Sequence, residues 1–558
     1  MPCPLVDSRF GHLNTRLADM VKVFSPGQPH GRWATCLSVC LALVLTFALL
    51  APGRVLAQPP SSTKPAAAKQ DIGAGKATAK AKGEADAAKD EGGADEPQTK
   101  VEKKADDQPP AEPPPDPSQT QKVSPVEIFK DPNAEALLDV KKYNPIRSVR
   151  MMPGDVEAVK VTAGNPNAAV DTTVIRRMVD GMVAQLTNTK NIQALIDPPP
   201  NMPAGSPTMR AIEEATRNLL EPIYMARAAQ NTRFLTEYNR ILLRSLQPLL
   251  KHHLVPRVQA MIVLGQSGNP EALKLFLDEI RNPRQTLWVK LWAIRGITNI
   301  KQNPSARLSA AQEIEAARVV AAQLDEKTKD MPWPLQLRAL EALSSLRQGY
   351  IPAAPKNAEM AVAAMRILAD PKARTEVRAE AARALGMMQI TTAVPDYNSP
   401  LVAYAAAQLA AWVGDQIVAS YSADKGTPLN ATKAEYLTAL LVGPVYQAFE
   451  GQAGVRESGL LHGNATTVRS DIQKVADQIK PVAKAALELI RAPKGQLKAR
   501  RADLAARVEA LKDFLAKNVP TNRHLVPDDD GFLEDAGSQA GAPAEPGAAK
   551  VAGATGGK

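Results

Sequence analysis

The residues of this chain that are best suited to acid–base or metal chemistry are few. Beyond residue 57 the sequence holds four histidines, which are His252, His253, His462 and His524. Neighbouring positions on a helix point about 100° apart, so His252 and His253 would diverge. No acid or further histidine lies three or four residues from either of them. We therefore expect a solvated or helix-capping pair and no metal site.

Other patterns that would indicate catalysis are missing from the sequence. It contains no His-Glu-x-x-His, no Gly-x-Ser-x-Gly and no glycine-rich phosphate loop. Carboxylate pairs such as Asp278 with Glu279, or Glu313 with Glu315, lie among lysines and arginines. That setting is typical of solvated, ion-paired helix surfaces. The sequence thus predicts a non-enzymatic protein with no catalytic residue, no cofactor and no metal.

A basic cluster near the C-terminus is the one candidate contact for an anionic partner. Within "KGQLKARRADLAARVEALKDFLAK" the cations are Lys498, Arg500, Arg501 and Arg507, and they accompany an apolar stripe of Leu504, Val508, Leu511 and Leu515. Such a helix can bind an anionic envelope component or membrane surface through its charges. It can equally be packed by its stripe and solvated by its charges. The sequence leaves both interpretations open.

The net charge narrows the class of partner. The chain carries +10, and the leader, linker and tail together sum to about −3, so the folded part carries about +13. Excess positive charge favours anionic partners. Nucleic acid is not expected, because the chain is predicted to be exported and because the expected helix 271–281 mixes both signs of charge.

The N-terminus predicts export. A basic leader precedes the uncharged run 34–51, "ATCLSVCLALVLTFALLA", and the small residues Val55 and Ala57 then lie just before Gln58. This is the pattern of a secretory signal peptide at 1–57, and a run of about 18 apolar residues also suits an uncleaved membrane anchor. Cys3, Cys36 and Cys40 are the only cysteines. The remainder therefore has no thiol, and we expect a periplasmic or envelope location, either secreted or anchored by 34–51.

Two segments have compositions that cannot support a packed core. Residues 58–124 are rich in alanine, lysine, acids and proline, and 528–558 are rich in glycine, alanine and acids. Segments without large apolar side chains cannot offset the entropy that ordering costs. We expect a disordered N-terminal linker and a disordered C-terminal tail.

The roughly 400 residues between the linker and the tail are predicted to be mainly helical. One stretch, 149–164, alternates β-branched residues and favours a single hairpin within a small first region, 125–205, that also holds a helix. Helix-period segments then follow one another. The expected parts are a repeat region at 206–420 and a C-terminal helical region at 421–527.

Within the repeat region, four segments share an alanine followed four residues later by leucine or isoleucine. These anchor alanines are Ala260, Ala293, Ala339 and Ala381, spaced by 33, 46 and 42 residues. Repetition at roughly 30 to 50 residues is typical of stacked helical hairpins. Second helices are expected to open at Asn269-Pro270, Asn303-Pro304 and Ser399-Pro400, and the longest interval is explained if 303–330 form an extended helix.

The segment "LADPKARTEVRAEAARALGMM", 368–388, resembles a HEAT repeat of the short bacterial type. It has an Asp-Pro pair, a Val-Arg pair, an apolar stripe and charges between them. In order these are Asp370, Pro371, Val377, Arg378, Glu380, Ala381, Arg383, Ala384, Leu385, Gly386 and Met388. The other copies depart from it, for example with Asn282-Pro283. The resemblance covers roughly 250–420 and implies an all-α fold, an α-solenoid that presents a curved surface to a partner.

These observations together predict an exported interaction scaffold of the cell envelope that binds a protein partner through its helical surface. A repeat fold by itself implies no chemistry. Two alternatives remain open at this point. One is an enzyme whose site lies in 126–250, and the other is a protein that binds a membrane surface or an anionic polymer through the basic cluster.

Overall fold

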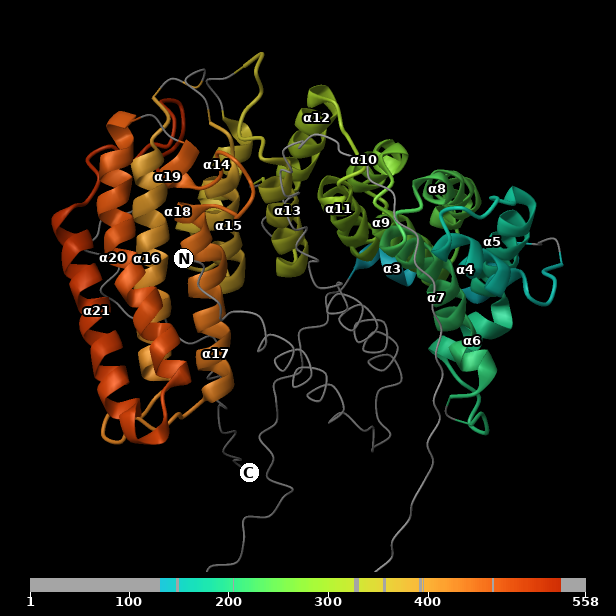
Figure 1. The fold of residues 1–558 in the computed structure, drawn as a ribbon, viewed down its shortest axis with the longest axis horizontal. Helices are drawn as coiled ribbons and strands as arrows, with labels where there is room; N and C mark the ends of the chain where they lie inside the picture. The colour runs from blue at the N-terminus through green and yellow to red at the C-terminus, as the bar shows by residue number, and fades with distance from the viewer. Residues whose placement is uncertain are drawn as a thin grey trace, which may run out of the picture. The chain divides into compact units, whose positions relative to one another are not determined.

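The computed structural model describes residues 131–532, apart from a few short gaps (Figure 1). The gaps are 147–149, 204, 326–330, 355–357, 391–393, 395 and 464–465. The chain divides into two compact units, Met1–Ile128 and Phe129–Lys558, and every described residue belongs to the second. The predicted leader at 1–57, the linker at 58–124 and the tail beyond 532 lie outside the described residues.

Every regular element in the described ranges is a helix. Strand-like pairing there is confined to isolated bridges such as Gln348 with Gln389. The predicted all-α class is therefore confirmed for this part of the chain.

The first described helices form a cluster around α7. Here α4 and α5 both pack on α7, α6 packs on α7, and α8 packs on α5. The elements are α3 (Pro132–Glu135), η3 (Val140–Lys142), α4 (Asp155–Gly164), α5 (Thr172–Thr187), α6 (Thr189–Ile196), α7 (Pro207–Ala228), α8 (Thr232–Leu246) and η4 (Gln247–Lys251).

The hairpin expected at 149–164 is wrong, because most of this stretch is helix α4. Gly154 takes φ 88° as the N-cap residue, a conformation that glycine adopts without strain. The Asp155 carboxylate accepts the Met152 N–H at 2.8 Å and pairs with Arg177 of α5 at 2.8 Å. A local cap and a tertiary ion pair thus outweigh the β preference of Val159 and its neighbours.

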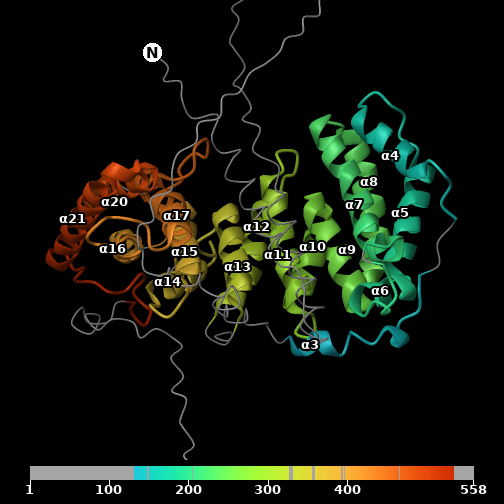
Figure 2. The same cartoon turned by 90° about the horizontal axis from the view of Figure 1, so that it is seen from below.

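The middle of the chain is a series of paired helices (Figure 2). One set, α9, α11, α13 and α15, packs in chain order, each on the one before. The other set, α10, α12 and α14, covers α11, α13 and α15 in turn. The bounds are α9 (Leu254–Ser267), η5 (Pro270–Ala272), α10 (Leu273–Arg281), α11 (Leu287–Gln302), α12 (Ala310–Ala321), η6 (Ala322–Leu324), α13 (Trp333–Leu346), α14 (Glu359–Ala369), α15 (Thr375–Met387) and α16 (Ser399–Ala419).

The four anchor alanines occupy equivalent places in α9, α11, α13 and α15. All four are fully buried. Five residues after each anchor the chain again has a small residue, and each of these is buried too. These residues are Gly265, Thr298, Ser344 and Gly386. Small side chains at both positions allow the helices to approach closely.

Of the three expected helix openings, two are confirmed and one is corrected. Helix α16 begins at Ser399, and Asn398 supplies its cap. Asn269 caps η5 as expected, by accepting the N–H of Glu271. Asn303-Pro304 forms a turn, and the next helix begins at Ala310, where Ser309 and Gln312 make a reciprocal capping box. The long interval between anchors therefore contains a loop and the short helix α12, not one extended helix.

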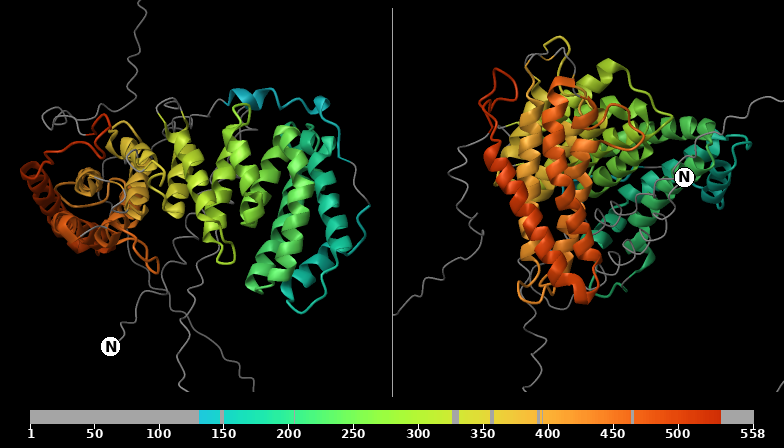
Figure 3. Two further views of the ribbon diagram at one scale, coloured as in Figure 1. Left: turned by 90° about the horizontal axis from the view of Figure 1, so that it is seen from above. Right: turned by 60° about the vertical axis from the view of Figure 1, so that its left-hand side comes forward.

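The C-terminal helices surround α16. Helix α16 packs on α20 and α21, which also pack on each other (Figure 3). Among the described helices α16 alone is long and apolar enough to cross a membrane, and 72% of its most apolar window is buried inside the protein. Its composition is accounted for by this packing. The remaining elements are α17 (Ala431–Leu440), η9 (Leu441–Val445), α18 (Tyr446–Glu450), α19 (Leu460–Gly463), α20 (Thr466–Arg491), η10 (Lys494–Gln496) and α21 (Leu497–Lys517).

Residues 528–532, which were expected to belong to the disordered tail, are part of the described fold. The Asp529 side chain is only 2% exposed and accepts the backbone N–H groups of Leu525 and Val526 at 2.6 and 2.9 Å. Asn398, at the start of α16, donates its N–H to the Leu525 carbonyl. These contacts hold the segment against α16 although its composition is acidic.

Candidate functional site

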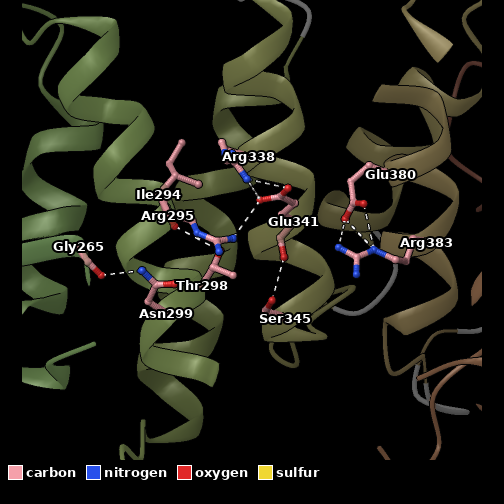
Figure 4. A network of polar contacts seen from close by, with 10 residues as sticks. All are labelled: Gly265, Ile294, Arg295, Thr298, Asn299, Arg338, Glu341, Ser345, Glu380 and Arg383. Carbon is pink, nitrogen blue, oxygen red and sulfur yellow. Dashed lines mark hydrogen bonds and ion pairs between the residues drawn. The ribbon is translucent and has the colours of Figure 1, made fainter. Parts of the chain in front are cut away.

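A set of charged side chains follows the anchors across α11, α13 and α15 (Figure 4). They occupy the position one residue before the anchor alanine or two residues after it. We call these five residues the polar ladder, and they are Arg295, Arg338, Glu341, Glu380 and Arg383. Because the helices pack side by side in chain order, equivalent positions lie along one face of the set.

The ladder consists of two ion pairs of opposite polarity and one bridging arginine. On α13, Arg338 Nη1 lies 2.8 and 2.6 Å from the two Glu341 carboxylate oxygens. On α15 the order is reversed, and Glu380 accepts Arg383 Nε at 2.9 Å and Nη2 at 2.5 Å. Arg295 of α11 reaches across to Glu341 at 3.4 Å. The second position after the anchor therefore alternates in sign along the three helices.

The ladder is partly withdrawn from water. The Glu380 side chain is 8% exposed, and the three arginines are 22–25% exposed. Burial raises the pKa of Glu380, and the positive charge of Arg383 opposes that rise. Burial lowers the pKa of Arg383, but Glu380 and Glu341 raise it by more, so this guanidinium stays charged.

Neighbouring polar side chains fix the helices that carry the ladder. Asn299 Nδ2 of α11 donates to the Gly265 carbonyl of α9 at 2.8 Å, which ties adjacent helices together. Ser345 Oγ donates to the Glu341 carbonyl at 2.9 Å, one turn away on α13. The charged groups thus stand on rigid elements and not on loops.

This arrangement is suited to binding. Three guanidiniums share two carboxylates, so one positive charge is left uncompensated. Arginine presents a planar fork of donors that matches a carboxylate or a phosphate. Within the described residues, no group of three or more His, Cys, Asp or Glu side chains is placed to hold a metal ion.

The ladder was not predicted from the sequence. Glu380 and Arg383 were expected only as charges beside the apolar stripe, and the structure buries Glu380. Alignment of the four segments on their anchor alanines places Arg338 and Glu380 one residue before the anchor, and Glu341 and Arg383 two residues after it. The reversed polarity of these two pairs is the signal that was available.

The histidine pair is buried and not solvated as expected. His253 is fully buried and His252 is 8% exposed. The capping alternative holds for His253, whose Nδ1 accepts the Val255 N–H at the start of α9. His462 is exposed and lies 3.9 Å from Glu450, and His524 Nδ1 lies 2.9 Å from Asp529.

The basic cluster on α21 is largely engaged within the chain. Arg500 pairs with Glu488 of α20 at 2.6 Å, and Arg507 pairs with Asp503 at 3.4 Å. Arg501 Nε donates to the carbonyls of Val418 and Tyr421, where a cation stabilises the C-terminal end of α16. Lys498 is exposed. The stripe of Leu504, Val508, Leu511 and Leu515 is buried.

An enzymatic site was the alternative for residues 126–250, and in the described part of that range a shallow depression of about 440 Å³ lies between α5 and α8. Its polar lining includes Thr172, Arg233 and Glu237. Glu237 is paired with Arg240 at 2.5 Å. Nearby, Ser245 Oγ donates to Asp180 at 3.0 Å.

No family model, curated protein or solved structure matches this chain. The described part of the chain is all-helical. The assignment of the polar ladder as a candidate site depends on the geometry of its side chains.

Proposed function

We propose that this protein is an exported, non-enzymatic interaction scaffold of the cell envelope, in which a HEAT-like α-solenoid within 206–420 binds a protein partner. The observation that carries the proposal is the equivalence of α9, α11, α13 and α15. Each has a buried anchor alanine and a small residue five positions later, and successive members of the set pack on one another. Repeats that contact only their neighbours create extended binding surfaces.

The polar ladder is the part of this surface that we assign to the partner. Arg295 and Arg338 compete for the single carboxylate of Glu341, so an acidic side chain of a partner can take over one of them with little loss to the other. A partly desolvated guanidinium binds a carboxylate more strongly than a fully exposed one does. We therefore expect a partner protein with acidic residues at the contact.

The basic cluster is a weaker candidate for an anionic envelope component. Arg500, Arg501 and Arg507 already have partners within the chain, and Arg501 stabilises the end of α16. Reversal of Arg501 to glutamate would therefore damage the fold as well as any binding. Of the four cations, Lys498 is the one for which the described residues show no such contact within the chain.

Affinity capture with matched variants tests the proposal. The full chain is immobilised, exposed to envelope extract, and the captured proteins are identified and then purified for direct binding. Arg338→Gln should weaken binding of the purified partner, whereas Arg318→Gln, on the exposed side of α12, should not. Equal binding by both variants and the wild type would exclude the ladder as the contact.

A further inference from the structure

A short segment before α4 lies across the ends of α9 and α11. We call residues 131–146 the strap. At α11, the Asp131 carboxylate accepts the Leu287 N–H at 2.6 Å, and at α9 the Leu137 carbonyl accepts the Leu254 N–H at 3.2 Å. Among strap residues whose burial is described, Asp131 alone is buried. The strap is therefore held by a few polar contacts and not by an apolar core.

His253 supplies one of these contacts through both ring nitrogens. Its Nδ1 accepts the Val255 N–H at 3.2 Å, so the neutral ring carries its proton on Nε2. Nε2 then donates to the Leu138 carbonyl of the strap at 3.2 Å. One neutral tautomer thus caps α9 and holds the strap at the same time.

His252 supplies a second contact beside it. Its Nε2 lies 2.9 Å from the Asn144 carbonyl of the strap, and its Nδ1 is buried without a hydrogen-bond partner in the described part of the chain. The Tyr143 ring packs on both imidazoles, with centroids 5.1 Å from His252 and 5.9 Å from His253. The two histidines and Tyr143 form the clasp of the strap.

A second proton on His253 is incompatible with this geometry. It would sit on Nδ1, directly against the Val255 N–H, at the positive end of the α9 dipole. Arg257 of α9 and the neighbouring His252 also oppose a cation there, while Asp139 of the strap favours one. Burial, the largest influence, lowers the pKa of His253, in keeping with this environment.

We propose that the clasp is a pH-sensitive latch, in which protonation of His253 releases strap residues 137–144 from the end of α9. Release lets the His253 ring reach water as imidazolium. It also frees the strap carbonyls of Leu138 and Asn144 from the helical body. Because the strap makes only a few polar contacts with the helical body, acidification would loosen residues 137–144 without unfolding the helices.

The size of the effect follows from the ordinary histidine pKa. A released histidine titrates near 6.5, so a docked ring that stays neutral at pH 5 favours release by up to about 30-fold relative to neutral pH. The docked state has the lower histidine pKa, so its stability is present above about pH 6.5 and is lost as the pH falls.

Hydrogen exchange of the full chain, at about pH 7.5 and about pH 5.0, tests the latch. Protection factors for 137–146, corrected for intrinsic rates, should fall by roughly tenfold or more at the lower pH, while those of α11 and α15 hold. In a double variant, His252→Asn with His253→Asn, asparagine can still cap α9 but cannot titrate. The pH-dependent fall should then be absent. His462→Asn, at an exposed site, should behave as wild type.

Two results would overturn the proposal. One is wild-type protection of the strap that does not change with pH, and the other is a fall that persists in the double variant. If the variant strap is unprotected at both pH values, exchange of the histidine ring hydrogens in the wild type decides. The latch stands if His253 gains its proton over the same pH range in which the strap loses protection, and fails if it does not.

Discussion

Gly386 of α15 is the position where the close approach of helices can be tested most sharply. A Cβ added there would lie 2.6 Å from Ala448 Cα and 2.7 Å from Ala448 C, and closer still to the Ala448 carbonyl oxygen. These are backbone atoms of α18, so no side-chain rotation can relieve the clash. The Gly386 carbonyl also accepts the Gly459 N–H at 2.8 Å.

The expected cost of Gly386→Ala follows from these contacts. Overpacking a rigid contact costs about 1–3 kcal/mol, and loss of the Gly459 hydrogen bond adds about 1 kcal/mol. The better helix propensity of alanine returns about 1 kcal/mol. The net loss of unfolding free energy should be about 1–3 kcal/mol, which for a body of about 400 residues lowers the melting temperature by roughly 1–4 °C.

Gly495→Ala is the matched control. Gly495 lies within helical segment η10, and a Cβ there would meet nothing within 4 Å. This variant should gain about 0.5–1 kcal/mol from the reduced flexibility of the unfolded chain. Thermal unfolding of both variants, followed by circular dichroism, should give shifts of opposite sign. A Gly386→Ala protein that melts at or above the wild-type temperature would refute the close packing of α15 on α18.

Three further predictions concern single side chains. Burial raises the pKa of Glu380 to about 7, so the wild type should lose up to about 3 kcal/mol relative to Glu380→Gln between about pH 4.5 and pH 7.5; parallel stability curves would contradict this. Ala381→Asp should destabilise by about 3 kcal/mol or more, because it puts an unpaired charge at a fully buried site, whereas Ala506→Asp on the exposed face of α21 should change the melting temperature little. The hydrogen bond from Arg177 lowers the pKa of Asp155, so its stabilisation should be present above about pH 4 and lost below. Asp155→Asn should cost about 1–3 kcal/mol at neutral pH and show less acid sensitivity, as measured by unfolding across pH.

Local pattern was enough to predict the helical class and the buried face of α15. The stripe of Val377, Ala381, Ala384, Leu385 and Met388 is buried, as its spacing indicated. The Asn269 cap was also readable, because a cap depends only on the few residues around it. These features lie within one helical turn of the residues that signal them.

What failed depends on residues far apart in the sequence. The buried state of His253 depends on Leu138, which lies 115 residues away. Helix α4 depends on Arg177 of α5, and the described end of the tail depends on Asn398 at the start of α16. No periodicity within a short window contains these partners, so composition and β propensity gave the wrong structure there.

The ladder is an intermediate case. Its residues are local, since Arg338 with Glu341 and Glu380 with Arg383 are each three residues apart on one helix. Recognition of the ladder requires a comparison of separate helices. Only the alignment of successive anchors shows that the two pairs occupy the same positions with opposite polarity.

Site-specific photo-crosslinking in cells tests the central claim most directly. A photoreactive residue replaces Ser345, one turn from Glu341 on the ladder face, in the full chain. A second chain carries it in place of Arg318 on the exposed side of α12. The account predicts a discrete crosslinked protein partner at 345 that is absent at 318 and is weakened when Arg338→Gln is added. Crosslinks at 318 alone, or equal crosslinks at both positions that ignore Arg338→Gln, would contradict a partner-binding surface on the ladder.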